Sequence, residues 1–555
     1  MAKRKQHQKW QKPKPGKARY EFWVWLALAV ILIFFAAIRV RFLSIPLERD
    51  EGEYAYSGQL ILQGIPPYRL AYNMKMPGIY YAYALVMAVF GQSVVGIHLG
   101  LLIVNVGAIA LMFFVGRRLF DSTVGLVAAA SYGFLTINQY VYGPQAHATH
   151  FVVLAALGGI LFLLKALESR RLSHIFWSGL LLGIGFIMKQ PGMLFVAFAV
   201  LYLAWSCLRE RPTCPAALLG RASLLAGSAA APFFLVCSIL YASGVFSRFW
   251  FWAVRYAGQY ASEMPMNAGV LTFLDHTETM LVPSYLLWIF AGLGLILLWA
   301  DAKSRPRGIF VTGFFLFAFL SICPGLFFRP HYYVTWMPAL ALLTGVAVGA
   351  GRNLLHRVPA LRSLSFVPGV AFLIALIVTM NSQSDFLFSV PVGWASRMMY
   401  GDSPWVETQE IARYIKQRTT PDDTIAVLGS EPQIYFYSER KSATGYIYTY
   451  SLTEPQPFAH QMQMEMISEI ERAQPKYLVY VDISTSWLRR PQSDPTIFQW
   501  QAKYCAGNYG LAGFVQWYFT SQSLSGYHAD YVWGEELLTH RPDPKIQCIY
   551  VFRRK

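Results

Sequence analysis

The chain is dominated by apolar runs long enough to cross a membrane. Apolar runs that are long enough to span, or almost long enough, lie at 22–43, 94–115, 122–142, 148–166, 174–190, 191–208, 218–241, 280–300, 309–326, 332–350 and 364–381. Only 14% of the residues are charged, against about a quarter in soluble domains, and the mean hydropathy is +0.37. Because about 20 apolar residues span a bilayer as a helix, we predict an α-helical polytopic membrane protein with about eleven transmembrane helices.

The basic residues set the expected orientation. The segment 1–21 carries eight Lys or Arg in its first 20 residues, and the apolar run after it lacks a small-residue cleavage site. We therefore predict a cytoplasmic tail, an uncleaved first span and an extracytoplasmic C-terminus. With this orientation every inside loop is basic: Arg117 and Arg118; Lys165, Arg170 and Arg171; Arg209, Arg211 and Arg221; Lys303, Arg305 and Arg307; Arg352, Arg357 and Arg362. A span at 78–91 would place these loops outside, so this short Tyr-rich run is predicted to be an interfacial helix.

The net charge of +17 is explained by this orientation rather than by a nucleic-acid partner, because the sequence carries no nucleic-acid-binding motif. It also has no P-loop, no GxGxxG between a strand and a helix, and no GxSxG, so nucleotide binding is not predicted. Among six Cys, Cys505 and Cys548 lie in the polar C-terminal region. They would form a disulfide in an exported domain or stay as two thiols.

Three regions follow from composition. They are the basic tail 1–21, a membrane domain 22–400 with long outside loops 44–93 and 242–279, and an extracytoplasmic region 401–555. In the last, helix-like segments at 403–419, capped by Ser403, and 456–473 alternate with apolar strands at 424–429, 476–482 and 546–553, which predicts a small α/β domain. Segments 51–63 and 246–260 of the two loops have the pattern of helices lying along the membrane surface.

Four acidic residues cluster directly after the first span: Glu48, Asp50, Glu51 and Glu53. Carboxylates at a membrane edge are commonly only solvated. Carboxylates this close also raise one another's pKa, which can leave one of them poised as a general base. We predict that Asp50 and Glu51 are catalytic and that Glu53 binds substrate.

Several basic and aromatic residues near the outer ends of spans are candidates for binding a lipid-linked phosphate. Lys75 precedes a Pro-Gly turn, Lys189 lies at a helix junction, and Arg329 begins the segment Arg-Pro-His-Tyr with His331 and Tyr332. Arg is a natural phosphate partner. The other interpretation is a lysine that snorkels to lipid headgroups and an aromatic belt with one anchoring Arg.

Two histidines and one arginine complete the candidates. His147 and His150 are spaced to share one helical face, which permits a divalent metal site but equally a polar cavity lining. Arg255, beside Tyr256 in the second long loop, is a further candidate for substrate binding. No cofactor other than this metal is predicted.

The residues of the first outside loop carry a resemblance to a known group. The acidic pair Asp50-Glu51, the Gly-x-Pro-Pro-Tyr at 64–68, the Lys-x-Pro-Gly at 75–78, the Gly-Arg-Arg-Leu-Phe at 116–120 and the Phe-x-x-His-Tyr at 328–332 resemble the GT-C superfamily. Within it, they resemble the protein O-mannosyltransferases and the lipid A aminoarabinose transferases. The resemblance implies a polyprenyl- or dolichyl-phosphate sugar donor, inversion at the anomeric carbon and a catalytic role for Asp50.

The sequence departs from this group at two places. Met74 stands where the aminoarabinose transferases have Glu before the Lys, so a metal site using that Glu is not implied. Gln145, His147 and His150 occupy a turn that in these enzymes often carries an acidic residue.

The expected function is an inverting glycosyltransferase of the bacterial inner membrane that moves a sugar from a polyprenyl-phosphate donor to an envelope acceptor, which is a protein, lipid or glycan. Two alternatives stay open: a catalytically inactive GT-C-like assembly subunit, and a lipid or solute transporter. Transporters tend to carry internal repeats and midplane charges, and neither is visible here.

Overall fold

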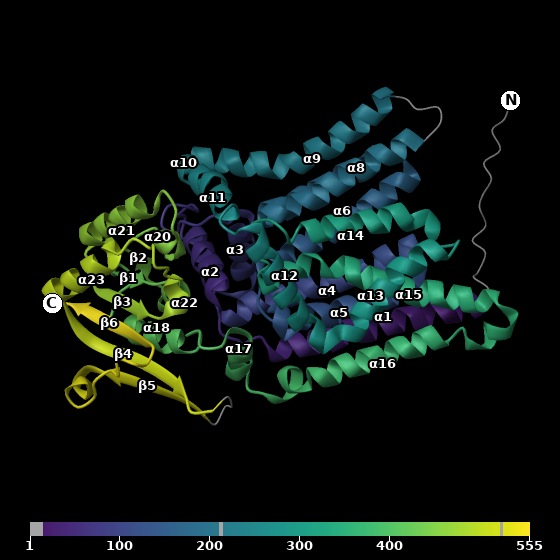
Figure 1. Cartoon of the computed structure of the whole chain (residues 1–555). Coiled ribbons are helices and arrows are strands. Elements are labelled where there is room, and N and C mark those ends of the chain that lie inside the picture. Colours follow the sequence, from purple (N-terminus) through teal and green to yellow (C-terminus); the bar gives the residue numbers. More distant parts are fainter. Residues whose placement is uncertain (1–14, 210–214, 522–525) are drawn as a thin grey trace.

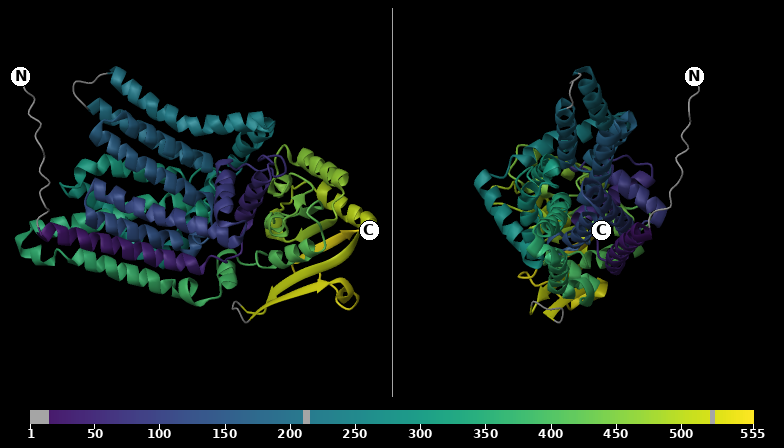
Figure 2. Two further views of the ribbon diagram at one scale, coloured as in Figure 1. Left: turned by 180° about the vertical axis from the view of Figure 1, so that it is seen from behind. Right: turned by 90° about the vertical axis from the view of Figure 1, so that its right-hand side faces the viewer.

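The computed structural model describes residues 15–209, 215–521 and 526–555. Most of the predicted basic tail and Arg211 lie outside these residues. The described chain forms a long bundle of helices with a mixed α/β region packed on one end (Figure 1). The start of α1 and the C-terminal sheet lie at opposite ends of the bundle, which a second view confirms (Figure 2).

Each of the eleven predicted spans overlaps a helix. These helices are α1 (Pro15–Arg41), α4 (Val94–Leu119), α5 (Ser122–Ile137), α6 (Ala148–Ser169), α7 (Leu172–Met188), α8 (Met193–Arg209), α9 (Pro215–Ala242), α13 (Tyr285–Ala300), α14 (Gly308–Leu320), α15 (Met337–Arg357) and α16 (Val367–Ser382). By length and composition, 8 helices of the described chain can cross a membrane. The predicted membrane class is confirmed. The helices α5, α7 and α14, with 16, 17 and 13 residues, are not among these eight.

Local capping chemistry moves two of the predicted boundaries. The run 122–142 ends its α-helix at Ile137, because the Asn138 side chain accepts a hydrogen bond from the Tyr140 N–H (2.8 Å) and starts a short 3₁₀ turn. The run 332–350 starts its α-helix at Met337, with Pro338 in the first turn, where proline is favoured. The segment before it, Pro330–Thr335, is a separate 3₁₀ helix, η6.

The two long loops fold into short helices. The first holds α2 (Arg49–Leu62) and α3 (Gly78–Phe90), and the second holds α10 (Phe246–Trp250), the π-helical turn η3 (Phe251–Tyr256), α11 (Ala257–Ala261) and α12 (Met266–Leu281). We expected the first of these helices to lie along the membrane surface. In the structure α2 is buried over nearly its whole length, because α3 and the C-terminal helix α19 (Gln433–Ser438) pack against it.

The C-terminal region contains one mixed sheet of six strands in the order β2-β1-β3-β6-β4-β5. The strands are β1 (Thr424–Leu428), β2 (Lys441–Ser442), β3 (Tyr477–Asp482), β4 (Tyr509–Phe519), β5 (Tyr527–Trp533) and β6 (Cys548–Arg554). β1 pairs in parallel with β2 and β3, whereas β6 and β4 continue the sheet in antiparallel fashion. The helices around it are α17 (Val392–Tyr400), α18 (Glu407–Gln417), α19 (Gln433–Ser438), α20 (Tyr450–Thr453), α21 (Ala459–Ala473), α22 (Ser484–Trp487) and α23 (Thr496–Asn508).

The predicted α/β class of this region is confirmed, with two corrections. β4 and β5 were not anticipated, although they form the longest hairpin of the sheet. Ser403 does not cap α18, whose N-cap is Val406. Cys505 and Cys548 are both free and buried, so of the two alternatives for them the structure has the thiols. The division of the chain near residue 400 stays a prediction.

Close helix packing in the bundle leads to a stability prediction. A Cβ on Gly294 of α13 would lie 1.9 Å from the Leu343 carbonyl oxygen of α15. We expect Gly294→Ala to lower the free energy of unfolding by roughly 1–3 kcal/mol, the usual effect of overpacking. The matched control is Gly292→Ala on the same helix, where a Cβ meets nothing within 4 Å. It should be neutral or slightly stabilising, since alanine favours helices over glycine. Thermal unfolding of the purified protein in detergent distinguishes the two, and equal midpoints would contradict the packing.

Candidate active site

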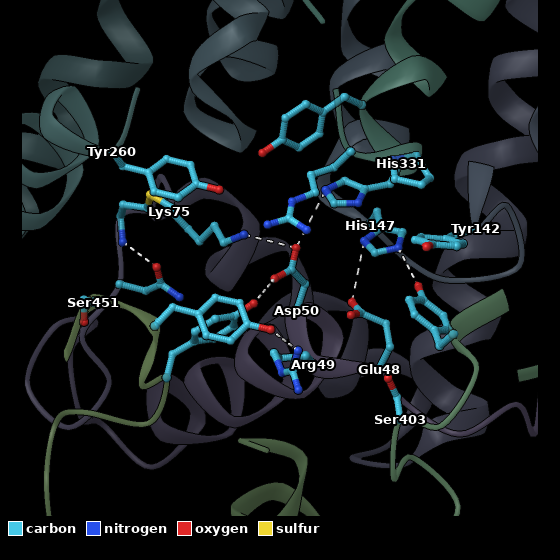
Figure 3. A pocket seen from close by; sticks show the side chains of 18 of the residues that line it. Glu48, Arg49, Asp50, Lys75, Tyr142, His147, Tyr260, His331, Ser403 and Ser451 are labelled. Atoms are coloured by element: carbon cyan, nitrogen blue, oxygen red, sulfur yellow. Dashed lines mark hydrogen bonds and ion pairs between the residues drawn. The ribbon is translucent and has the colours of Figure 1, made fainter. Parts of the chain in front are cut away.

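A cavity of about 250 Å³ lies where one end of the bundle meets the C-terminal region. Its walls come from the start of α2, the loop that follows it, the second long loop, η6 and several C-terminal segments. Figure 3 shows its lining side chains gathered around Asp50. Residues far apart in the sequence therefore share one partly open cavity.

Asp50 lies in the first turn of α2 and faces this cavity. Its Oδ2 atom is 3.1 Å from the Lys75 Nζ atom and 3.8 Å from the His331 Nε2 atom. The hydroxyl of Tyr448, from the C-terminal region, donates to Oδ1 at 3.5 Å. Asp50 is therefore held between a cation from the first loop and a phenol from the C-terminal region.

The carboxylates of the acidic cluster have pKa values that are shifted in different directions. Burial would raise the pKa of Asp50, but the Lys75 ammonium, with smaller contributions from His147 and Lys189, lowers it to about 2. The pKa of Glu48 is raised because it is buried and close to the charges of Asp50 and Glu51, and the pKa of Glu53 is raised by burial. Asp50 is therefore ionised and weakly basic, whereas Glu48 favours its protonated form.

Glu51 is buried away from the cavity, which differs from its predicted catalytic position. Its Oε1 atom lies 3.0 Å from the His98 Nε2 atom and accepts a hydrogen bond from the Ala146 N–H. With Glu48 it forms a reciprocal capping box, since the Glu51 N–H donates to the Glu48 carboxylate at 2.9 Å and the Glu48 N–H donates back at 3.3 Å. Such a box stabilises the start of a helix, so the contacts of Glu51 in the structure belong to the start of α2, and its predicted catalytic role stays a prediction.

Glu53 is also enclosed. Its carboxylate accepts hydrogen bonds from the Asn73 side chain at 2.6 Å and from the Tyr80 hydroxyl. Burial, opposed by Lys75, raises the pKa of Glu53 to about 8. It does not line the cavity and instead anchors the loop that carries Lys75.

The predicted phosphate-binding residues converge near Asp50. Lys75, Arg329, His331 and Tyr332 all line the cavity. The Lys189 Nζ atom lies 3.9 Å from the centre of the Tyr332 ring, so this residue sits directly behind the lining. Burial and the charge of Lys75, opposed by Asp50 and Glu48, lower the pKa of Lys189 to about 7. In the sequence each of these residues was proposed from its own short segment, and the fold brings them together.

His147 and His331 form a stacked pair. Their ring centres are 4.2 Å apart with planes inclined by 10°. The His147 Nδ1 atom is 3.6 Å from the Glu48 carboxylate, and its Nε2 atom is 3.1 Å from the Tyr400 hydroxyl. Burial lowers the pKa of both imidazoles, to about 3 for His147, so both are neutral near pH 7.

These histidines and Asp50 place three ligand atoms within 4.8 Å of one another, a spacing that could hold a metal ion. His150, the predicted partner of His147, does not take part. It is fully buried inside α6, and neither ring nitrogen has a hydrogen-bond partner among the described residues. Two His at the predicted spacing diverge because His147 lies before the first helical residue, Ala148.

Arg255 lies outside the cavity, whereas its neighbour Tyr256 lines it. The Arg255 guanidinium packs over the Phe251 and Phe458 rings instead, at 6.0 and 5.8 Å. The Tyr256 hydroxyl donates to Glu454, a cavity residue of the C-terminal region. The second loop does contribute to the site, but through its aromatic residues.

The C-terminal region supplies a wall that the sequence did not predict. Its lining residues are Ser403, Trp405, Tyr448, Tyr450, Ser451 and Glu454. The only sequence signal for them was the Tyr-rich segment 446–450, which has no recognisable motif.

Arg49 joins this wall to the helix that carries Asp50. Its guanidinium forms a buried ion pair with Glu431 at 2.9 Å and donates to the Ser430 carbonyl and the Tyr450 hydroxyl. It also stacks on the Trp405 ring at 5.0 Å. The residue next to Asp50 is thus fixed by the C-terminal region through four contacts.

Comparisons with known proteins agree with this architecture. Residues 74–236 match the family model described as dolichyl-phosphate-mannose-protein mannosyltransferase. Among curated protein sequences no match was found.

Solved structures match over almost the whole chain. ArnT from Cupriavidus metallidurans bound to undecaprenyl phosphate is 16% identical, covers 94% of this chain and 99% of its own, and gives a TM-score of 0.56. AglB, an oligosaccharyltransferase from Archaeoglobus fulgidus in complex with an inhibitory peptide and a dolichol-phosphate, is 13% identical, covers 95% and 75%, and gives 0.50. At these identities the likeness concerns the fold. The chain is a multi-pass membrane protein with the GT-C glycosyltransferase fold, and its resemblance to the mannosyltransferase and ArnT-like group is confirmed.

Proposed function

We propose that the chain is an inverting glycosyltransferase that transfers a sugar from a polyprenyl-phosphate donor to an envelope acceptor on the extracytoplasmic side of a bacterial inner membrane. The observation that carries this proposal is the convergence of one ionised carboxylate, Asp50, with the cations Lys75, Lys189 and Arg329 at the outer end of the bundle.

The cations provide the phosphate end of the site. Lys75 and Arg329 line the cavity, and Lys189 lies behind Tyr332. Preorganised cations stabilise the charge that develops on a leaving phosphate. ArnT and AglB, which share the fold, were solved with undecaprenyl phosphate and dolichol-phosphate, which favours a lipid phosphate as the donor here.

The reaction is a single displacement. An acceptor hydroxyl attacks the anomeric carbon from the face opposite the phosphate. The new C–O bond forms as the bond to the phosphate oxygen breaks, and the polyprenyl phosphate leaves with the bonding electrons. Asp50 accepts the hydroxyl proton and later releases it to solvent. The expected contribution of such a base is about 10²–10⁴-fold in rate.

Lys75 determines when Asp50 is basic enough for this step. In the ligand-free site the ion pair with Lys75 keeps the pKa of Asp50 near 2, too low for an efficient base near neutral pH. A donor phosphate competes for the Lys75 ammonium. Weakening the ion pair raises the pKa of Asp50, because its burial then dominates.

Asp50, His147 and His331 could instead serve as ligands of a divalent metal ion. The three residues offer one carboxylate and two neutral imidazoles, a donor set that suits a first-row transition metal. Such a metal would act as a Lewis acid toward the phosphate. Asp50 already pairs with Lys75, and the nearby ammonium groups repel a further cation, so we assign the phosphate to the cationic side chains.

The first prediction concerns Asp50→Asn. With membranes containing the full chain and a panel of radiolabelled polyprenyl-phosphate sugars plus envelope extract, wild type should move label from the lipid carrier. The variant should be about 10²–10⁴-fold slower, with the protein still in the membrane. The matched control is Asp482→Asn on β3, an exposed position outside the cavity, which should keep full activity.

Full activity of the purified Asp50→Asn protein would show that Asp50 is not the base. Absence of transfer from every donor by wild type would instead favour an assembly subunit or a transporter.

The second prediction concerns pH. Below its pKa of about 7 the Lys189 amine is charged, and above it the amine is neutral. If Lys189 binds the donor phosphate, the donor KM should rise by roughly tenfold between pH 6 and pH 8, following the charged fraction of this amine. Lys189→Arg should flatten that rise, since a guanidinium stays charged.

The control for this experiment is Lys303→Arg, in the exposed loop between α13 and α14, which should leave the wild-type profile unchanged. An unaltered profile in Lys189→Arg would remove Lys189 from phosphate binding.

A further inference from the structure

Contacts with the C-terminal region run along α2, the helix that carries Asp50. The Tyr56 hydroxyl accepts a hydrogen bond from the Ser442 N–H at 2.7 Å. One turn earlier, a Cβ on Gly52 would lie 2.6 Å from the backbone nitrogen of Gln433 in α19, so only glycine allows this close approach. Helix α2 therefore rests on the C-terminal region as well as on α3.

Arg49, the first residue of α2, lies at the carboxyl ends of the parallel strands. Strand β1 lies between β2 and β3 in the sheet and pairs in parallel with both. Ser430 and Glu431 follow β1, and Ser486 follows β3. Open α/β sheets commonly bind a ligand in the crevice outside such strand ends. Here that place is taken by a side chain of the same protein, the Arg49 guanidinium, which contacts Ser430 and Glu431.

Glu431 is held in place by its own region. The Ser486 hydroxyl donates to its Oε2 atom at 2.6 Å, while its Oε1 atom forms the ion pair with Arg49 at 2.9 Å. A Cβ on Gly429 would lie 2.5 Å from the Oε2 atom, so glycine leaves room there for the carboxylate. The Glu431 side chain is completely buried, and a buried charge that loses its partner is strongly unfavourable. Arg49 and Glu431 therefore depend on each other.

All three nitrogens of the Arg49 guanidinium have a partner in the C-terminal region. The Nε atom donates to the Ser430 carbonyl, Nη1 to the Tyr450 hydroxyl and Nη2 to the Glu431 carboxylate. A planar guanidinium with three separate partners is fixed in direction and in rotation, whereas a single ion pair would fix only a distance. Because Asp50 is the next residue in the same helical turn, these contacts also fix the direction of its carboxylate.

We propose that Arg49 and Glu431 are positioning residues of the transfer reaction, through which the C-terminal region holds Asp50 in its reactive orientation. The proposal rests on the glycosyltransferase function above. The cations assigned to the donor phosphate, Lys75 and Arg329 among them, come from other segments of the chain. Loosening the Arg49–Glu431 pair should therefore slow the transfer at saturating donor without weakening donor binding. A displacement of about 1 Å can lower a rate by about 10²-fold.

A second buried Arg–Glu pair in the same region provides the matched control. Arg397 of α17 and Glu407 of α18 form an ion pair whose side chains are 5% and 0% exposed, against 9% and 0% for Arg49 and Glu431. Neither Arg397 nor Glu407 belongs to the described residues that line the cavity. Glu407→Gln therefore makes the same chemical change as Glu431→Gln at a pair that does not hold α2.

The first measurement is the rate of label transfer at increasing concentrations of radiolabelled polyprenyl-phosphate sugar, with the full chain in lipid nanodiscs and envelope extract as acceptor. Glu431→Gln and Arg49→Lys should each lower the rate at saturating donor by about tenfold to 10²-fold, with the donor KM changed by less than about threefold. Glu407→Gln should keep the wild-type rate per folded molecule. A wild-type rate in Glu431→Gln, an equal loss in Glu407→Gln, or a change in the donor KM alone would overturn the proposal.

The second measurement is the rate of the double variant Arg49→Lys/Glu431→Gln. Both changes break the same set of contacts, so the double variant should lose about as much rate as either single variant. Residues that act together are not additive in this way. A loss equal to the product of the two single losses would mean that Arg49 and Glu431 act separately, and it would overturn the proposal.

The third measurement is hydrogen exchange followed by mass spectrometry, which needs no turnover. Peptides that cover 49–62 should exchange about tenfold faster in Glu431→Gln than in wild type, because local opening of α2 becomes easier. They should exchange at the wild-type rate in Glu407→Gln. Unchanged exchange in Glu431→Gln would overturn the proposal. If wild type moves no label from any donor, the proposed function fails, whereas hydrogen exchange still decides whether Arg49 and Glu431 hold α2.

Discussion

Burial of the acidic start of α2 is the constraint on which the site depends. Four carboxylates within six residues, Glu48 to Glu53, are almost completely removed from solvent, and a buried charge is strongly unfavourable unless it is paired or neutralised. Each carboxylate meets this condition differently: Asp50 through Lys75, Glu51 through His98 and a backbone N–H, Glu53 through Asn73 and Tyr80, and Glu48 through a raised pKa. The first loop, the bundle and the C-terminal region must all close around α2 for these partners to be present.

Much of this architecture was predictable from sequence because it follows from local rules. The spans were located because a bilayer requires long apolar runs, and the break between α7 and α8 fell at Lys189-Gln190-Pro191 as expected. The β4–β5 hairpin was missed because its sequence mixes glycines, aromatics and polar residues without a clean two-residue alternation. Helix boundaries shifted where a single side chain, such as Asn138, competes for backbone hydrogen bonds.

The site was less predictable, for geometric reasons. Asp50 and Glu51 are adjacent in sequence, yet successive helical residues point about 100° apart, so one faces the cavity and the other faces His98. Clustering was expected to raise the pKa of one carboxylate, and it does so for Glu48 and Glu53. The pKa of Asp50 is lowered instead because Lys75, 25 residues later, lies 3.1 Å away. Tyr448 and Tyr450 reach the cavity from nearly 400 residues downstream. A single sequence without recognisable motifs in that segment cannot reveal such a contact.

The ion pair between Lys75 and Asp50 has a kinetic consequence under the proposed function. A glycosyltransferase that uses an activated lipid-linked sugar must avoid hydrolysing it. A carboxylate that stays acidic until the carrier displaces its lysine cannot activate an acceptor, or a stray water molecule, in advance. Activation of the acceptor would then wait for the carrier, whichever substrate binds first, and this coupling originates in one 3.1 Å contact.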